Sequence, residues 1–376
     1  MLRSVYVHNY RSFVDTRIDF ERCTGIVSDV GAGVTSLVEL LERVVEIVTR
    51  GAPVSCVFGA SSRTPWLKEP VQRFAMEIER GGVLYTYHLD VCVDEEEDRD
   101  DGHEEAWVVQ EALSRNGRLI FRRTDFAAAR GRPPAGHRVS PTSSVVLIDN
   151  SQTAAFGVAV ERIVALSIES RGVLCWTPER GGSLGPSGRD LVGWFGGVAK
   201  TFPDVFGRLT RALQPWIKGL RRLRIEDFPS GYTVFMATFS HGGVEYDVDH
   251  ESLSDGERTL LLLYAVAVGG IATERVTTLF VDGPELGLAP HALGPLCAAL
   301  EGALREGGGQ LIVASKHPAV LDAIAPRRAL LFARPRGGPT VVRSVDEQVT
   351  GGLRVSEWIA TPAAFDEEHE HEETNP

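Results

Sequence analysis

The chain has 376 residues, of which 43% are hydrophobic and 24% charged, and its formal net charge at pH 7 is −12. This length suffices for one large domain or two ordinary ones, and the acidic balance argues against a general nucleic-acid coat protein. No apolar run approaches about eighteen residues and the N-terminal stretch has no apolar signal region, so we expect a cytoplasmic protein without a membrane span.

The five cysteines are scattered without a C-x-x-C pair, which fits a reducing compartment and argues against a cysteine zinc site. Much of the acidic excess lies in residues 94–105 and 366–376, and both segments are typical of solvated or disordered chain. Without these two segments the rest of the chain is closer to neutral.

The first fifty residues predict two strands, a glycine-rich loop and a helix. Residues 3–20 alternate in the manner of strands, with a turn near Asn9–Ser12. The apolar run Gly25–Val27 leads into SDVGAGVTSL, residues 28–37, and an apolar helical pattern continues to about Thr49. A strand, a glycine loop and a helix in this order are the layout of a phosphate-binding P-loop.

The middle of the chain predicts hairpins, loops and helices. We expect a hairpin over 75–90 through Gly81-Gly82 and a second strand pair over 107–123 around Asn116-Gly117. The other expected elements are a loop at 124–150, a helix at 152–168, a linker at 181–188, helical chain at 191–222 with a break at Pro215, and strands within 224–249.

From Ser254 onward, helical and strand patterns alternate. We expect helices at 259–268 and 291–305 and strands at 277–281 and 310–314, which is typical of a parallel sheet covered by helices. The expected organisation has four parts: residues 1–90 and 241–345 as the two halves of one α/β lobe, 91–240 as a variable insertion with a helical arm, and 346–376 as an acidic tail.

Four stretches stand in a familiar order: the P-loop-like turn, SLSDGERTLLLL from Ser252, TLFVDGPELGLAP from Thr278, and QLIVASKHPAVLDAI from Gln310. Together they resemble the ABC-type ATPase heads of the RecF/OLD-like group, relatives of the SMC ATPases. That group shows LIGxNGxGKSxLLEAL, LSxG(E/T), LLIDEPExxLHP and QxIVTTHSPxLLD in this order. The resemblance covers residues 1–50 and 185–345. It implies a P-loop NTPase α/β fold with a mainly parallel sheet, an N-terminal antiparallel β subdomain and a helical insertion.

In a P-loop, backbone N–H groups hold the phosphates, a lysine contacts the β- and γ-phosphates, and a Ser or Thr holds Mg²⁺. The lysine position here is Val34, and the usual asparagine of the loop is Val30. Losing a charge-assisted contact costs roughly 1.5–3 kcal/mol, so ATP binding would weaken by about one to two decades without necessarily being lost. The resemblance assigns the nucleotide to Gly31, Ala32, Gly33, Val34, Thr35 and Ser36, and the metal to Thr35 and Asp282.

The third stretch keeps one acidic residue of the hydrolytic centre and lacks another. Asp282 ends an apolar strand and is expected to act through Mg²⁺ and its waters, but the family's water-activating glutamate is Gly283. Losing a general base costs roughly 10²–10⁴ in rate. Glu285 matches the second glutamate of the family motif, which belongs to the next turn and faces the dimer interface.

In the fourth stretch the family's switch histidine aligns with Lys316. One interpretation is that Lys316 supplies the positive charge missing at Val34, and the other is that it is a loop lysine facing solvent. A one-residue shift that lets His317 serve as the switch is a further alternative.

The second stretch keeps the family signature intact in residues Leu253, Ser254, Asp255, Gly256 and Glu257. In the family, the serine hydroxyl, the glycine N–H and the helix N-terminus bind the γ-phosphate held by the opposite protomer. The same residues also fit a capping box, in which Ser254 caps the helix and Glu257 lies three residues on. The capping box does not explain the other three motifs, so we favour the signature interpretation.

These features predict an ATP- and Mg²⁺-binding head with impaired hydrolysis that acts as a dimer. An intact signature beside an impaired P-loop favours a heterodimer with a complete ABC ATPase over a homodimer. Two other functions stay open. One is an active ATPase in which Lys316 replaces the lysine and Glu285 or Glu257 is the base, and the other is a scaffold that binds no nucleotide.

Arginine-rich stretches raise the question of DNA binding. Residues 114–138 contain seven arginines and one acid, and Arg221, Arg222 and Arg224 form a second group. Family heads contact DNA through such lobes, whereas a solvated loop has the same composition, and the salt dependence of binding separates the two. Relatives with attached nuclease domains act in DNA repair and phage defence. This chain has no room for such a domain after the fourth motif, so we expect any nuclease to be a separate protein.

Overall fold

The computed structural model describes residues 1–93, 106–124, 153–168, 190–229, 232–271 and 273–361, with 144, 146, 176–177, 184–185, 188 and 364. The acidic run 94–105, the tail 366–376 and most of the expected loop 124–150 and linker 181–188 lie outside these residues. Within the described part, no helix is both long and apolar enough to cross a membrane. The four cysteines in that part are free thiols.

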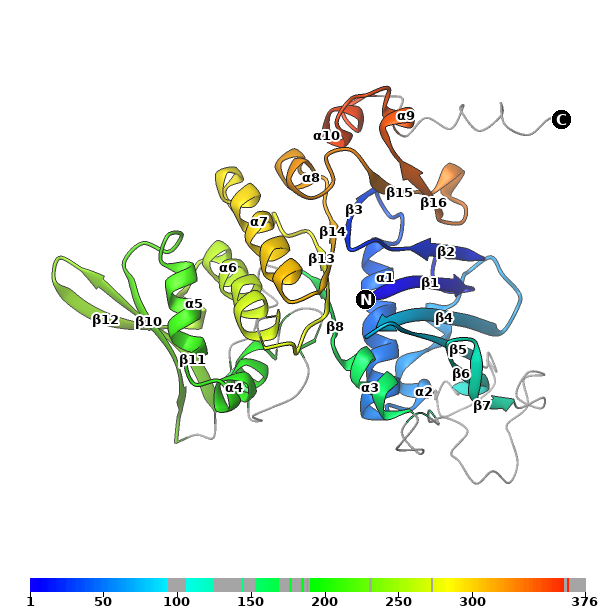
Figure 1. Ribbon diagram of the computed structural model, residues 1–376, viewed down its shortest axis with the longest axis horizontal. Coiled ribbons are helices and arrows are strands. Elements are labelled where there is room, and N and C mark those ends of the chain that lie inside the picture. The colour runs from blue at the N-terminus through cyan, green and yellow to red at the C-terminus, as the bar shows by residue number, and fades with distance from the viewer. Residues whose placement is uncertain are drawn as a thin grey trace.

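An antiparallel sheet of six strands, in the order β2-β1-β4-β5-β6-β7, forms the N-terminal part of the molecule (Figure 1). The hairpins turn at Gly81-Gly82 and Asn116-Gly117, as predicted, because these residues adopt the positive φ that two-residue turns need. The strands are β1 (Leu2–His8), β2 (Thr16–Asp19), β4 (Val71–Arg80), β5 (Val83–Val93), β6 (Ala106–Arg115) and β7 (Arg118–Thr124).

A second six-stranded sheet, in the order β16-β15-β3-β14-β13-β8, lies at the centre of the molecule. All neighbouring strands run parallel except β16, which pairs antiparallel with β15. The carboxyl ends of the parallel strands therefore share one edge, where ligands bind in open α/β sheets. The strands are β3 (Cys23–Ser28), β8 (Ile163–Ser167), β13 (Thr278–Asp282), β14 (Gln310–Ala314), β15 (Ala329–Ala333) and β16 (Val341–Val345). The predicted mixed α/β class is confirmed.

Helix α1 (Val34–Val45), which continues through a π-helical turn (Glu46–Arg50), is enclosed between the two sheets. Its buried side chains share one apolar cluster with Phe74 of β4 and Phe280 of β13. The apolar residues of α1 form one broad face, and because this face contacts strands of both sheets, the helix joins the sheets through its packing. The buried residues are Val34, Leu37, Val38, Leu40, Leu41, Val44 and Val45.

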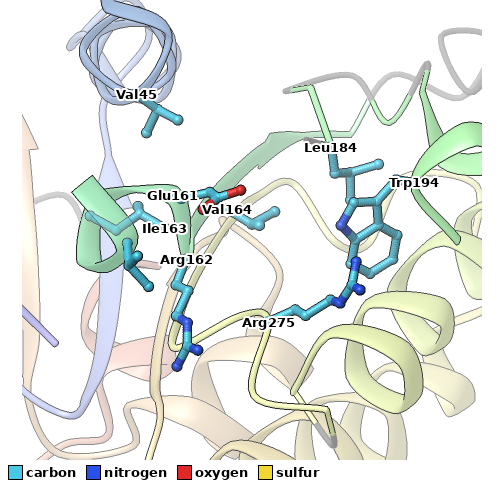
Figure 2. Close-up of a pocket in the computed structure, with 9 residues that line it drawn as sticks. Val45, Glu161, Arg162, Ile163, Val164, Leu184, Trp194 and Arg275 are labelled. Carbon is cyan, nitrogen blue, oxygen red and sulfur yellow. The ribbon is translucent and has the colours of Figure 1, made fainter. Parts of the chain in front are cut away.

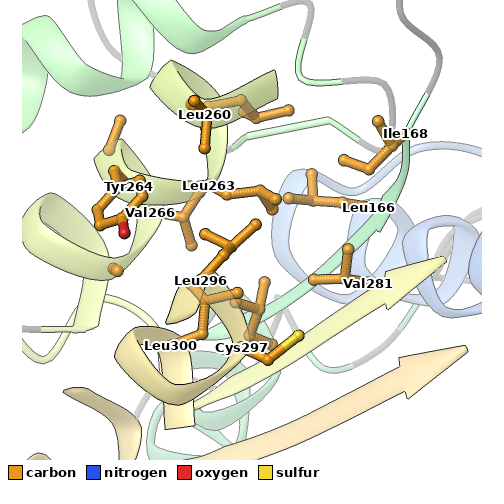
Figure 3. Close-up of a cluster of buried hydrophobic side chains, with 14 of the residues drawn as sticks. Leu166, Ile168, Leu260, Leu263, Tyr264, Val266, Val281, Leu296, Cys297 and Leu300 are labelled. Carbon is orange, nitrogen blue, oxygen red and sulfur yellow. The ribbon is translucent and has the colours of Figure 1, made fainter. Parts of the chain in front are cut away.

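Three helices cover the opposite face of the central sheet: α6 (Asp255–Ala265, continuing as the π-helical Val266–Ile271), α7 (Pro290–Glu306) and α8 (Pro318–Ile324). Figure 3 shows Leu263 of α6 and Leu296 of α7 packed toward Leu166 and Val281 of the sheet. Phe280 faces α1 and the next residue faces these helices, which is the period of two expected when both faces of a sheet are covered.

The chain between β8 and α6 forms a lobe on the far side of α6 from the N-terminal sheet (Figure 1). The expected helical arm is instead two helices packed on a sheet, since Phe195 of α4 and Phe206 of α5 contact Phe235 of β11. Helical chain extends only to Leu213 instead of residue 222, and it is interrupted before Pro203, which disfavours helix at the residue preceding it. The elements are α4 (Leu191–Thr201), α5 (Val205–Leu213), β9 (Trp176–Thr177), β10 (Leu220–Asp227), β11 (Thr233–His241) and β12 (Val244–Asp249).

The predicted helix at 152–168 is wrong in its second half. Helix α3 (Ala154–Glu161) ends at Arg162, and Ile163–Ser167 form β8, an edge strand that lies parallel to β13. The run IVALS is short and apolar, so periodicity alone does not distinguish a buried strand from a buried helix. Three short helices complete the described fold: α2 (Val54–Val57), α9 (Glu347–Thr350) and α10 (Val355–Trp358).

Gln310 is a fully buried polar side chain where the two sheets meet. Its Oε1 accepts hydrogen bonds from Leu2 N at 2.8 Å and from Thr278 Oγ1 at 3.0 Å. Its Nε2 donates to the carbonyl oxygens of Leu2 and Glu21, both at 2.8 Å. The amide thus uses both donors and both acceptor positions to hold β1 against the amino ends of β13 and β14.

We expect Gln310→Leu to lower the free energy of unfolding by about 2–4 kcal/mol, because the N–H and C=O of Leu2 are left buried without partners. Urea denaturation measures the effect. Gln348→Leu, at an exposed position of α9, makes the same chemical change and should stay within about 0.5 kcal/mol of the parent. Equal losses in the two variants would contradict this role for Gln310.

Candidate functional site

The P-loop-like turn lies between the carboxyl end of β3 and the first residue of α1. Gly31 and Gly33 adopt φ values of 72° and 93°, which side chains other than glycine rarely adopt. A Cβ on Gly33 would lie 3.0 Å from both the Phe13 ring and Ser12 Oγ, so the position also lacks space. Backbone N–H groups in such a turn, at the positive end of a helix dipole, form a binding site for anions.

Two buried hydroxyl groups from distant parts of the chain support the backbone of this turn. Ala32 O accepts a hydrogen bond from Thr340 Oγ1 at 3.2 Å, and Thr340 Oγ1 in turn lies 2.7 Å from Ser12 Oγ. Both hydroxyls are buried. These contacts connect the turn to the β1–β2 connection and to the start of β16, and they hold the backbone in place without any ligand.

Thr35 and Asp282, 247 residues apart in sequence, meet at this edge of the sheet. Thr35 Oγ1 donates a hydrogen bond to Asp282 Oδ2 at 2.9 Å. Burial raises the pKa of Asp282 above its usual range, and the nearby Glu285 adds to this, whereas the Thr35 hydrogen bond and the charge of Lys316 oppose it. A hydroxyl and a carboxylate are hard oxygen ligands of the kind that Mg²⁺ prefers.

The protein supplies few ligands beyond this pair. The described chain contains no group of three or more His, Cys, Asp or Glu side chains placed to hold a metal. Magnesium in phosphate sites commonly takes one or two protein ligands and completes its shell with water and phosphate oxygens. The two oxygens of Thr35 and Asp282 therefore fit a nucleotide-bound Mg²⁺ better than a resident ion held by protein alone.

At the position of the family lysine, Val34 has an apolar side chain that is buried among other apolar side chains. The side chain of Val34 is only 6% exposed and belongs to the cluster that joins α1 to both sheets. Val30, at the usual asparagine position, is 82% exposed at the tip of the turn. Neither side chain offers a charge or a hydrogen bond to a phosphate.

Gly283 departs from the family pattern in its backbone as well as its side chain. Its φ is 70°, and its N–H donates to Ala314 O at 3.0 Å. A Cβ added at this φ would be strained and would lie 3.3 Å from Leu286 Cδ1. A glutamate at this position would therefore require a different turn after β13.

The two glutamates considered as substitute bases already have partners within the chain. Glu285 Oε2 accepts a hydrogen bond from Ser315 Oγ at 2.9 Å. Glu257 Oε2 accepts from both the N–H and the hydroxyl of Ser254, each at 2.8 Å. These hydrogen bonds involve only Oε2 of each carboxylate and hold both side chains in their present directions.

Lys316 and His317 follow β14 and differ in what they contact. Lys316 is exposed and close enough to Asp282 to lower its pKa. His317 Nδ1 accepts a hydrogen bond from the N–H of Ala319 at 3.2 Å and so caps helix α8. Of the two, Lys316 is the one whose charge acts on Asp282.

The signature begins helix α6 with a complete capping box. Glu257 N donates to Ser254 Oγ at 3.3 Å, and the Glu257 carboxylate accepts from Ser254 N. Ser254 is exposed, while Leu253 is buried beneath it. The local cap and an exposed signature serine thus exist together.

The signature also packs directly against the turn that follows Asp282. A Cβ on Gly256 would lie only 2.4 Å from Gly287 O, and Gly287 itself has φ 78°. Thr259 Oγ1 donates to Leu286 O at 3.2 Å, one residue before this glycine. The sequence gives one signal for this contact, the glycine in PELGL, which motif matching passes over because the family pattern leaves that position open.

The chain matches no protein-family model and no curated protein sequence. In structure it is similar to an SMC head bound to the C-terminal winged-helix domain of ScpA, with a TM-score of 0.55 and 13% identity over 92% of this chain and 97% of that one. The chain has an SMC-head fold, which is an ABC-type ATPase fold. An SMC head with an extended coiled coil, bound to ScpA from Pyrococcus furiosus, gives a TM-score of 0.49 at 13% identity over 96% and 99% of the chains. The SMC head of Thermotoga maritima gives 0.47 at 14% identity over 92% and 99%.

The basic residues of this SMC-head fold are only partly available to a ligand. Arg221 and Arg222 on β10 are exposed. Arg224 is not part of an open patch, because it bonds to Asp247 at 2.8 Å and to Glu226 at 2.5 Å. Of the first group, Arg115, Arg118, Arg122 and Arg123 lie on or beside β6 and β7, and Arg130, Arg132 and Arg138 lie outside the described residues.

A pocket of about 330 Å³ lies beside the amino end of β8, between α1 and α4 (Figure 2). Val45 of α1 and Trp194 of α4 line it, together with Arg162 and Arg275. Because the P-loop-like turn and Asp282 lie at the carboxyl ends of the parallel strands, this pocket is separate from the candidate nucleotide site.

The close approach of Gly256 and Gly287 predicts that a larger side chain at residue 256 disturbs the signature. Gly256→Ala should destabilise the fold by about 1–3 kcal/mol and displace residues 253–257, because the added methyl group meets the Gly287 carbonyl. Gly302→Ala is the matched control, since its Cβ on helix α7 meets nothing and the change should be neutral or stabilising. Urea denaturation and hydrogen exchange at the start of α6 measure both effects. Unchanged exchange in Gly256→Ala would contradict the contact.

Glu42 on α1 predicts how the stability of the fold depends on pH. Burial and the nearby Glu46 raise its pKa to about 7. A raised folded-state pKa favours the protonated form, so this stabilising contribution is full below the ordinary glutamate pKa of about 4.3 and is lost as pH rises through 7. Glu42→Gln should therefore unfold at higher urea than the parent at pH 8 and at equal urea at pH 4. The exposed Glu306→Gln is the control, and a gain in Glu42→Gln that does not depend on pH would contradict the assignment.

Proposed function

We propose that this chain is an ATP-binding head of the ABC type whose own hydrolysis is impaired. The observation that carries the proposal is the Thr35–Asp282 hydrogen bond at the carboxyl edge of the sheet, directly beside a glycine turn shaped for anions. This is where a nucleotide and its Mg²⁺ would need a hydroxyl and a carboxylate together. Bound Mg-ATP would supply the phosphate oxygens that complete the metal shell.

The chain's own residues account for binding better than for hydrolysis. The N–H groups around Gly31 and Gly33 would hold phosphate oxygens, and Thr35 and Asp282 would orient the metal. The family's general base corresponds to Gly283, which has no side chain. This counts against an active ATPase, and a substitute base at Glu285 or Glu257 would act from a side chain that Ser315 or Ser254 holds by its Oε2. The glycine turn and the Thr35–Asp282 pair count against a scaffold that binds no nucleotide.

We further propose that the head works in a dimer, as a homodimer or with a complete ABC ATPase. The exposed Ser254 and the adjacent Gly256 would contact the nucleotide held by the other subunit. A homodimer would place two impaired sites together, so a heterodimer makes better use of the intact signature. By resemblance to the RecF/OLD-like group, the process would be linked to DNA, in repair or phage defence, with any nuclease on a separate protein.

The proposal predicts that the purified chain binds Mg-ATP with micromolar to submillimolar affinity and releases no phosphate. Calorimetry and a phosphate assay on the same sample measure both. Asp282→Ala should weaken binding of Mg-ATP, because the metal loses its carboxylate. Asp19→Ala removes an exposed carboxylate on β2 and should bind as the parent does.

Each other result would change the assignment. No binding at millimolar ATP would leave the scaffold alternative, and steady turnover would require a base that we have not identified. Light scattering with Mg-ATP separates the dimer alternatives. The chain should stay monomeric if its partner is a different ATPase, and its mass should double if it forms a homodimer.

A further inference from the structure

Arg334 lies against the P-loop-like turn, one residue beyond the end of β15. Because β15 is the parallel neighbour of β3 and Phe332 pairs with Ser28, the strand register carries Arg334 up beside the turn. Its Nη1 lies 3.5 Å from Gly31 O, and its guanidinium carbon lies 5.7 Å from the ring centroid of Trp66. The contact joins segments 303 residues apart and is not part of any motif in the sequence.

The guanidinium is held in place but has donors to spare. Its Nε donates to Gly338 O at 2.9 Å and its Nη2 to Gly337 O at 2.6 Å. With the contact to Gly31, these use three of the five N–H donors of an arginine. No carboxylate of the described chain forms an ion pair with it, so a full positive charge remains beside the turn.

This charge lies where the family lysine is missing. Val34 contributes none, and the other cation near the site, Lys316, is exposed beyond β14 on the opposite side of β3 and acts on Asp282. A planar guanidinium with two unused donors matches the oxygens of a phosphate group better than a single ammonium does. The Trp66 ring, 45% exposed, stabilises the guanidinium by a cation–π contact and keeps its orientation.

We propose that Arg334 binds the phosphate chain of the nucleotide and supplies the positive charge that residue 34 lacks. The proposal rests on the ATP binding proposed above. It assigns to Arg334 the phosphate contact that a P-loop lysine would otherwise make. The ligand chemistry is a polyphosphate, carried either by a nucleoside triphosphate or by a free anion such as tripolyphosphate.

Calorimetric titration of the full chain with Mg-ATP, and separately with tripolyphosphate, tests the proposal. Arg334→Gln should weaken both ligands about tenfold to hundredfold, because one charge-assisted phosphate contact is lost. Arg334→Lys keeps the charge but loses the planar guanidinium, so its affinity for both ligands should lie between those of the parent and of Arg334→Gln. Arg336→Gln makes the same charge change on the same turn and should stay within about twofold of the parent.

The outcomes separate this proposal from the proposed function. If the parent binds Mg-ATP and Arg334→Gln binds it equally well, the role of Arg334 is overturned and ATP binding stands. If Arg334→Gln weakens ATP but not tripolyphosphate, Arg334 acts on the nucleoside and the phosphate assignment is overturned. If the parent binds neither ligand, ATP binding itself fails. Should Arg334→Gln not fold, Arg334→Lys decides, since affinity equal to the parent's would show that the planar guanidinium is not used.

Tryptophan fluorescence gives a second readout that does not depend on affinity alone. Tripolyphosphate should change the emission of the parent, because its negative charge binds the guanidinium that lies against the Trp66 ring. The change should be absent in Trp66→Phe and in Arg334→Gln and present in Arg336→Gln. A change that persists in Trp66→Phe would arise from another tryptophan and would count against ligand contact at Arg334.

Discussion

Burial of helix α1 between two sheets is the constraint on which the candidate site depends. The helix has one broad apolar face, which contacts strands of both the antiparallel sheet and the central sheet and gains stability from that burial. That packing fixes where the helix begins, and with it the glycine turn and Thr35. It also explains why residue 34 is poorly placed to hold a charge in this chain, since its side chain forms part of the same apolar cluster.

The turn after Asp282 differs from the family pattern in its backbone as well as in its side chains. Gly283 sits in a left-handed turn, and the two nearest candidate bases accept hydrogen bonds from Ser315 and Ser254. A glutamate at residue 283 would meet a left-handed backbone and the Leu286 side chain, so the turn itself would have to change. The signature differs, because Ser254 and Gly256 also serve the chain itself, as a helix cap and as the close contact with Gly287. These internal roles maintain the signature geometry in the folded chain without a nucleotide.

Much of the fold followed from the sequence, and the exceptions have physical causes. The hairpins, the turn before α1 and the alternating elements after Ser254 were predictable because glycine pairs and apolar periods are local signals. Strand β8 was missed because five apolar residues have no period that separates strand from helix, and only the partner β13 decides between them. The order of the motifs identified Thr35 and Asp282 as site residues. It did not identify Arg334, because the position of that residue depends on the register between β15 and β3. Contacts of this kind, set by neighbouring strands and not by spacing along the chain, are what sequence reasoning misses.

The proposed site contains features that favour binding and lacks those that favour turnover. Loop N–H groups, a helix N-terminus and two cations on opposite sides of β3 would all stabilise a polyphosphate, and none of them activates water. A ligand that binds only the folded, correctly arranged head would stabilise that arrangement by an amount that rises with the logarithm of its concentration above Kd. The turn after Asp282 packs against the signature through Gly287 and Gly256, so an arrangement stabilised at the chain's own site also constrains the surface offered to a second subunit. In such a head the nucleotide would act as a ligand that shapes the dimer face, and its hydrolysis would be left to the partner's site.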